Sequence, residues 1–313
     1  MNKGKKIAEG GMLLALYSIL LFITINIPFL GMITFFLLPI PFVLVMIKET
    51  ISWSIGFLAV ASVLGIIIGT ILSLPTVLLT GVMGIVIGYH VKHNKSTIQM
   101  FISSVLAFIV GSLLILIATN IILDMNVVDE TLTMVEESME TSFDMMDMLG
   151  QNVTDDMKQQ MRDSIEMIPM MIPSMLVISS MVMAYIFILA SQPFIKRFSD
   201  KVVKWPLFHE LRLPKSILWY YLITLVATFF MNTDDHSYVN MVILNLMFIL
   251  QLFILLQGFS LVFYISYVKG WRKFVPILIT VVSLLNPIFL TIIRILGIID
   301  LGFPFREAIT KSK

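Results

Sequence analysis

Residues Phe101 to Leu123 read FISSVLAFIVGSLLILIATNIIL and contain no charged side chain. A helix needs about 20 apolar residues to cross the hydrocarbon core of a bilayer. In lipid the backbone of such a segment can satisfy its hydrogen bonds only within a helix or a closed barrel, and the alternating pattern of a barrel strand is absent. The stretch therefore predicts a transmembrane helix.

The composition of the whole chain extends this conclusion. Of its 313 residues, 58% are hydrophobic and only 13% are charged, against about 25% charged in soluble domains. A net charge of +1 argues against a nucleic-acid-binding protein. The chain has no cysteine, which excludes disulfides, thiolate metal sites and cysteine nucleophiles.

Eight more apolar segments accompany the first. They cover residues 8–27, 31–47, 51–72, 75–91, 167–190, 217–231, 239–267 and 274–298. Asn286-Pro287 breaks the last segment, which either spans or turns back as a re-entrant segment. The sequence thus predicts an all-α polytopic helical membrane protein with eight or nine transmembrane segments.

The basic residues give the orientation. With the N-terminus inside, 15 of the 21 Lys and Arg fall in cytoplasmic connections, while only Lys158 and Arg162 fall in outward ones. We therefore expect a multi-pass protein of the cell membrane with a cytoplasmic N-terminus. The C-terminal tail lies outside if 274–298 spans and inside if it turns back.

Residues 124–166 form the largest polar segment and hold 12 of the 20 acidic residues. Apolar residues recur there at helical spacing: Val128, Leu132, Val135, Met139, Phe143, Met146 and Leu149. Gly150 suits the end of this helix, and Thr154 can cap a second one that carries Met157, Met161 and Ile165. We expect an amphipathic helical extracytoplasmic cap that packs on the mouth of the bundle.

These segments suggest three regions. Residues 1–195 would form a six-helix membrane domain that includes the acidic cap. Residues 196–216 would form a basic cytoplasmic connection with Trp205 and Phe208, suited to the membrane interface. Residues 217–313 would add the C-terminal membrane segments and a short tail.

Two sets of residues are candidates for function. Polar side chains near the outer ends of the spans could bind a substrate or merely bridge helices: Asn26, Thr70, Thr76 and Asn120. Small residues follow one face of the first span and permit close helix packing, either within the chain or with a partner: Ala8, Gly11, Ala15 and Ser18. Arg294 is expected to reach the interface or to pair with Asp300.

Catalytic motifs are missing. The chain has no P-loop and no H-E-x-x-H sequence, and no serine, histidine and acid cluster suggests a nucleophilic site. His90 and His93 lie one helical turn apart beside lysines, which favours a solvated boundary over a metal site. We expect no enzyme activity, no cofactor and no metal.

Two resemblances add to these predictions. The opening Glu9-Gly10-Gly11 to Ala15-Leu16-Tyr17, the run Leu38-Pro39-Ile40-Pro41 and the ending Leu296 to Arg306 resemble the YybS-like family of uncharacterised bacterial multi-pass membrane proteins. Residues 1 to about 195 are also similar to the substrate-binding S components of energy-coupling factor transporters, through Gly11-x-x-x-Ala15, Pro39-Ile40-Pro41 and the order of spans.

The second resemblance implies an outward ligand pocket and a separate transmembrane coupling subunit with ATPases. The long acidic cap and the extra C-terminal segments depart from that pattern. We therefore expect a transport-related membrane protein that binds a small solute from outside and relies on a partner for energy. The alternative is a membrane scaffold within an envelope protein complex, with no ligand; membrane lipid is a partner in either case.

Overall fold

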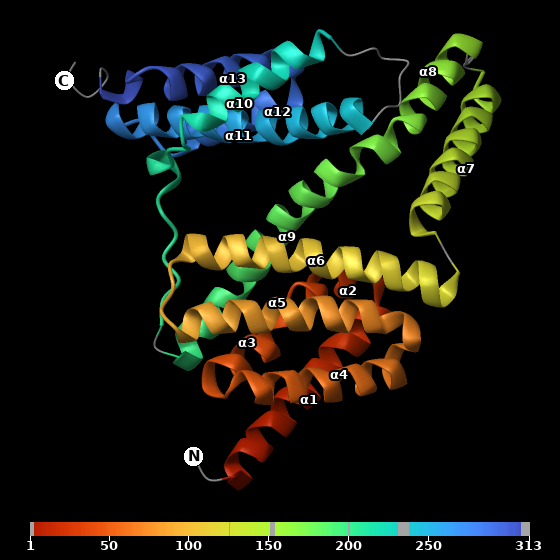
Figure 1. The fold of residues 1–313 in the computed structure, drawn as a ribbon, viewed down its shortest axis with the longest axis vertical. Helices are drawn as coiled ribbons and strands as arrows, with labels where there is room; N and C mark the ends of the chain where they lie inside the picture. The colour runs from red at the N-terminus through yellow and green to blue at the C-terminus, as the bar shows by residue number, and fades with distance from the viewer. Residues whose placement is uncertain (1–2, 125, 151–153, 200, 231–237, 308–313) are drawn as a thin grey trace. The chain divides into compact units, whose positions relative to one another are not determined.

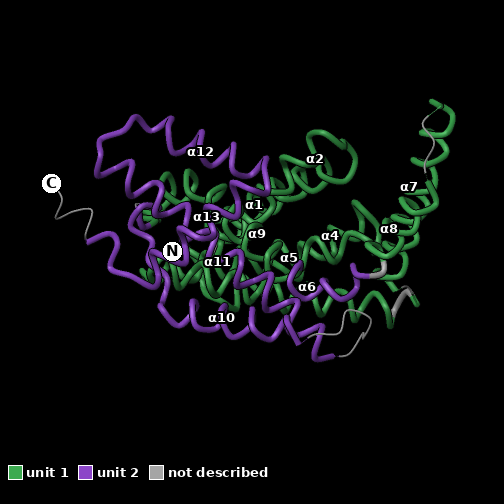
Figure 2. The backbone as a smooth tube through the Cα atoms, turned by 90° about the horizontal axis from the view of Figure 1, so that it is seen from above, with its two compact units in different colours: residues 1–165, 176–205 green, residues 166–175, 206–313 purple. Residues whose placement is uncertain are grey.

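The computed structural model describes residues 3–124, 126–150, 154–199, 201–230 and 238–307, and they fold into α-helices joined by short connections (Figure 1). The chain divides into two compact units (Figure 2). Unit 1 comprises residues 1–165 and 176–205, and unit 2 comprises residues 166–175 and 206–313. The all-helical fold expected from the sequence is confirmed.

Unit 1 begins with six helices and ends with a cap and a long final helix. They are α1 (Lys3–Asn26), α2 (Pro28–Phe35), α3 (Pro39–Lys48), α4 (Ile51–Gly69), α5 (Leu74–Lys92), α6 (Thr97–Leu123), α7 (Val127–Met148), α8 (Asp155–Glu166) and α9 (Ile168–Ser199). Helix α9 contributes residues 168–175 to unit 2 and the remainder to unit 1.

Proline and threonine interrupt two of the predicted spans. The segment 31–47 is split into α2 and α3 by a tight turn at residues 36–38, and Pro39 starts α3 because a proline needs no backbone donor there. Helix α4 ends before Thr70, whose φ is +63°. A 3-10 turn, Ile71–Ser73, follows, and its Ser73 hydroxyl donates to the Gly65 carbonyl at 2.7 Å.

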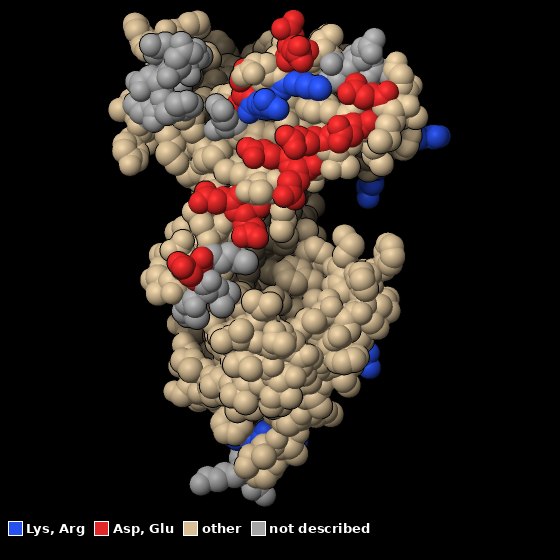
Figure 3. Space-filling model, turned by 90° about the vertical axis from the view of Figure 1, so that its right-hand side faces the viewer, with Lys and Arg blue, Asp and Glu red and all other residues tan. Residues whose placement is uncertain are grey.

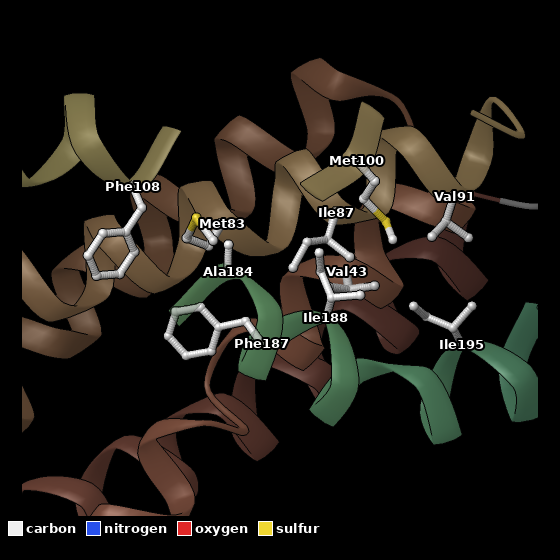
Figure 4. Close-up of a cluster of buried hydrophobic side chains, with 10 residues drawn as sticks. All are labelled: Val43, Met83, Ile87, Val91, Met100, Phe108, Ala184, Phe187, Ile188 and Ile195. Carbon is white, nitrogen blue, oxygen red and sulfur yellow. The ribbon is translucent and has the colours of Figure 1, made fainter. Parts of the chain in front are cut away.

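Close backbone contact between α3 and α5 organises the core of unit 1. A Cβ atom added to Gly84 would lie 2.6 Å from Phe42 Cβ, and one added to Gly88 would lie 2.7 Å from the Val43 carbonyl oxygen. Beside this contact lies a buried cluster that includes Met83, Ile87 and Phe187, drawn from α5, α9 and neighbouring helices (Figure 4). Glycine allows the two helix backbones to meet.

Ion pairs join helix ends on the side of unit 1 predicted to be cytoplasmic. Lys6 Nζ lies 2.6 Å from Glu49 Oε2, and Lys48 Nζ lies 3.1 Å from Glu9 Oε2, which links α1 to the end of α3. Lys201 donates to the carbonyls of Val91 and Lys92, the last turn of α5. A cation is favourable there because the carbonyls at a helix C-terminus are otherwise unpaired.

The acidic cap consists of α7 and α8, as the sequence predicts. Gly150 follows α7 with a φ of +74°, and the Thr154 hydroxyl accepts a hydrogen bond from the Met157 amide at 3.4 Å. Met139 and Phe143 in the apolar stripe are buried, whereas Leu149 at its end is exposed. Acidic side chains gather in a band over these helices (Figure 3).

Besides the start of α9, the described residues of unit 2 form four helices and a short 3-10 turn. They are η2 (Phe208–Glu210), α10 (Ser216–Thr228), α11 (Tyr238–Val268), α12 (Phe274–Leu285) and α13 (Pro287–Gly302). Helices α11 and α13 meet at Gly258 and Gly297, where an added Cβ would clash with the carbonyl oxygens of Ile293 and Ile254.

The segment 274–298 turns back in the structure. Asn286 is extended, with φ −135° and ψ 121°, and its side chain caps α13 by accepting from the Ile288 amide at 2.9 Å. Helix α12 begins six residues after α11 ends, and beyond α13 the Arg306 carbonyl meets the Tyr264 hydroxyl near that same end of α11. The segment is therefore a hairpin of two helices, and whether it spans the membrane or is re-entrant stays a prediction (Figure 1).

Seven helical segments among the described residues are long and apolar enough to cross a membrane: 4–26, 28–48, 51–69, 71–92, 97–121, 168–199 and 238–268. Two shorter apolar helices, α10 and α12, accompany them. The predicted segment 217–231 thus corresponds to a 13-residue helix, and its last position lies outside the described residues.

The contact between α3 and α5 leads to a stability prediction. Gly84→Ala should lower the stability of unit 1 by about 1–3 kcal/mol, because the methyl group meets Phe42 and the backbone of Pro39. Thermal unfolding of the detergent-purified protein measures the change. Gly56→Ala on α4 is the control, since its Cβ would meet no described atom within 4 Å. Equal midpoints for the two variants would contradict this packing.

Candidate functional site

The four polar residues predicted to bind a substrate lie at one end of unit 1. Asn26 ends α1, Thr70 follows α4, Thr76 lies in the first turn of α5, and Asn120 lies near the end of α6. Asn26, Thr70 and Asn120 are exposed, and the Asn26 amide donates to the Phe22 carbonyl in its own helix at 2.9 Å. Thr76 is half-buried. The four residues thus lie at the same end of unit 1 in the structure. Their role in binding a substrate stays a prediction.

Helix α1 presents its small residues outward. Ala8, Gly11 and Ala15 are exposed, while Ser18 is half-buried and donates to the Leu14 carbonyl at 3.0 Å. A Cβ added to Gly11 would meet no described atom within 4 Å. The glycines at 65, 69, 81, 84 and 88 in the same unit all press against a neighbouring element.

The opposite face of α1 holds the helix in place. Tyr17 and Leu21 are fully buried, and the Tyr17 ring meets the Phe42 ring edge-on at a centroid distance of 4.9 Å. Because α1 is anchored through this face, its small-residue face is left uncovered within the described part of unit 1. We call Ala8, Gly11 and Ala15 the open face of α1.

Unit 2 contains a buried polar network that the sequence did not reveal. Arg306 Nη2 lies 2.6 Å from Asp300 Oδ2, and the two side chains are 3% and 2% exposed. Arg306 also donates to the His209 carbonyl at 2.8 Å and to Ser260 Oγ at 3.1 Å. Gln257 donates to Asp300 and accepts from the Leu213 amide. The network ties η2, α11 and α13 together.

Of the two alternatives given for Arg294, pairing with Asp300 is wrong, because Asp300 pairs with Arg306. Residues six apart on a helix point in directions about 120° apart around its axis, so these side chains lie on different faces of α13. Arg306 reaches Asp300 instead, because the chain leaves the helix at Phe303 and folds back. Arg294 keeps a buried Nε atom without a hydrogen-bond partner among the described residues.

Two hollows lie near charged groups. One, of about 120 Å³, lies in unit 2 and is lined by residues that include Arg212, Lys215 and Arg306. The other is an open, acidic hollow of about 530 Å³ at the start of α7, lined by Asp129, Glu130 and neighbouring residues. Within the described residues, no group of three or more His, Asp or Glu side chains is placed to hold a metal ion.

Long apolar helices with basic residues near their ends are the features of a helical membrane protein. Residues 15–301 match the family described as "Predicted membrane protein (DUF2232)", so the chain belongs to that family and is a multi-pass membrane protein. It is also 26% identical over 311 residues to "Uncharacterized protein YybS" of Bacillus subtilis (strain 168), which covers 99% of this chain and all of that protein. No solved structure matches the chain.

Because the network in unit 2 is buried, substituting one of its charged residues should strongly lower the stability of the protein. Asp300→Asn removes the carboxylate that pairs with Arg306 and should destabilise the protein by about 3–5 kcal/mol, because a buried cation loses its ion-pair partner. Thermal unfolding in detergent is the measurement.

Glu9→Gln serves as the control for that substitution. It removes one carboxylate from the solvent-exposed Lys48–Glu9 pair and should change the stability by less than about 1 kcal/mol. The double variant Asp300→Asn with Arg306→Gln should recover part of the loss. If Asp300→Asn were as mild as Glu9→Gln, the ion pair would not stabilise unit 2.

Proposed function

We propose that this protein is a transport-related membrane protein whose N-terminal part binds a small solute from outside and works with an energy-supplying partner. The observation that carries the proposal is the open face of α1. In lipid the hydrophobic effect does not drive helices together. Small residues promote helix association there because they allow the two backbones to approach each other closely. A face built this way and left uncovered is suited to a helix from another chain.

The proposal extends the predicted division of the chain. Residues 1–195 act as the solute-binding domain, with Asn26, Thr70, Thr76 and Asn120 at its outward end. A transmembrane coupling subunit with ATPases supplies energy, since the chain itself has no nucleotide-binding motif. The shared end of the four polar residues supports this assignment.

The proposed topology follows the basic residues. The N-terminus, the 196–216 connection and the end of α11 face the cytoplasm, and the acidic cap faces outside the cell membrane. Helix α10 crosses the membrane in addition to the seven long helices, and the hairpin of α12 and α13 enters and leaves on the cytoplasmic side. Lys269, Arg272 and Lys273, which connect α11 to α12, support this placement.

If a partner helix docks on the open face of α1, blocking that face should remove the partner's activity from the purified protein. The double variant Gly11→Leu and Ala15→Leu covers the open face and should abolish the ATP hydrolysis activity that co-purifies with the tagged protein from its native membrane. The protein itself should remain folded, because an added Cβ at Gly11 has open space. ATP hydrolysis per mole of tagged chain is the readout.

Gly56→Leu is the matched control for docking, because Gly56 is also an exposed helical glycine whose Cβ would meet no described atom within 4 Å. It should keep the co-purifying activity. Undiminished activity in the Gly11 and Ala15 variant would rule out this face as the docking surface.

Solute binding is tested separately, by a thermal-shift screen of vitamins, nucleobases and amino acids. A bound solute stabilises only the folded state and should raise the unfolding midpoint. Asn26→Ala with Asn120→Ala should remove that rise. If no compound in the panel raises the unfolding midpoint, the alternative is favoured, a membrane scaffold of the cell envelope. The exposed acidic and methionine-rich surface of the cap supports that alternative.

A further inference from the structure

The small cavity of unit 2 lies where several elements meet. Its lining comes from the loop before α10, from Gln257 on α11 and from the end of α13 with the turn beyond it. Its volume is about 120 Å³, or the space of roughly four liquid water molecules. It can therefore hold one small polar group.

The lining of the cavity is positively charged. Asp300 is already neutralised by Arg306, whose N–H groups also reach the His209 carbonyl and Ser260. The basic groups available to a ligand are Arg212 and Lys215, two exposed residues on the loop that leads into α10. Glu307 is the remaining acidic residue of the lining.

Apolar aromatic residues surround this charged cavity. Phe303 and Phe305 are part of its lining, and both are exposed. Trp219 lies one helical turn after Lys215 and is also exposed. Tryptophan is enriched at the level at which lipid headgroups lie, so an exposed Trp219 near basic residues is typical of that level.

From this combination we propose that the cavity binds a phosphate group, supplied by the headgroup of an anionic phospholipid. Arginine and lysine are the usual partners of phosphate oxygens, arginine through paired N–H donors and lysine as a point charge. Basic pockets between helices on the cytoplasmic side of membrane proteins hold such headgroups. The phosphate would enter the cavity beside Arg212 and Lys215, and the acyl chains would extend along the exposed aromatic rings.

The network around the buried ion pair holds the loop of the proposed site in place. Gln257 joins the Leu213 amide to Asp300, so the loop that carries Arg212 and Lys215 is anchored to α11 and α13. The two basic residues are thus presented by an ordered loop, which lowers the entropy lost when a phosphate binds.

Native mass spectrometry of the full chain in a neutral detergent tests the proposal. Phosphatidylglycerol should bind with higher affinity than phosphatidylcholine, whose headgroup is zwitterionic. The double variant Arg212→Gln and Lys215→Gln should weaken phosphatidylglycerol binding on the order of thirtyfold, since each basic group near anionic lipid contributes about one step of five- to sixfold. The charge-conserving variant Arg212→Lys with Lys215→Arg should retain most of the binding.

A matched control separates the cavity from general surface charge. Arg272→Gln with Lys273→Gln removes two exposed positive charges from the same end of unit 2 but outside the cavity lining. This control should keep the affinity within about twofold, because general attraction to the lipid surface is weak in detergent. Equal weakening in both double variants, or unchanged binding in the Arg212 and Lys215 variant, would overturn the proposal.

A competition arm identifies the source of the phosphate. Inorganic phosphate at millimolar concentration should leave bound phosphatidylglycerol in place, because it lacks the acyl chains that contact the aromatic residues. The contrary result is that inorganic phosphate displaces the lipid from the wild-type protein but not from the Arg212 and Lys215 variant. That result would support a phosphate site in the cavity but would show that its ligand is a soluble anion and not a phospholipid. Wild-type unfolding midpoints in both double variants show that the fold is intact.

Discussion

A lipid bilayer offers the backbone no water to bond with, and the architecture of this chain follows from that constraint. The apolar segments are helices, and at two of the breaks between them a side chain bonds a backbone group that would otherwise be unpaired. The Ser73 hydroxyl bonds the Gly65 carbonyl where α4 ends. Asn286 caps α13 at the tip of the α12–α13 hairpin. Prolines occur mainly at first turns, where a missing N–H costs little.

The same constraint makes glycine the means of joining helices. Because apolar side chains gain little by leaving lipid, helices associate where their backbones can meet. Gly84 and Gly88 do this between α5 and α3, and Gly258 and Gly297 do it between α11 and α13. The open face of α1 also consists of small residues, but it is exposed in the described part of the chain. This contrast within one unit is the physical basis for expecting a partner helix.

Much of the helical layout could be predicted from the sequence, because hydropathy and start and stop residues are local signals. The cap follows from its helical stripe with Gly150 and Thr154. The ion pair between Asp300 and Arg306 could not be predicted, since it depends on a turn after α13 that brings the chain back. Sequence spacing instead suggested Arg294, which the helix turns away from Asp300. Which face of α1 is covered likewise depends on tertiary packing.

Cysteine labelling tests the central claim, that the cap lies outside while the α12–α13 hairpin returns to the inner side. The chain has no cysteine, so in a variant with one introduced cysteine the maleimide labels this protein at that position alone. The positions Thr133 on α7, Lys269 after α11 and Glu307 after α13 are all exposed. A membrane-impermeant maleimide should label Thr133→Cys in intact cells and should label Lys269→Cys and Glu307→Cys only after permeabilisation. Labelling of Glu307→Cys in intact cells, or protection of Thr133→Cys, would contradict the account.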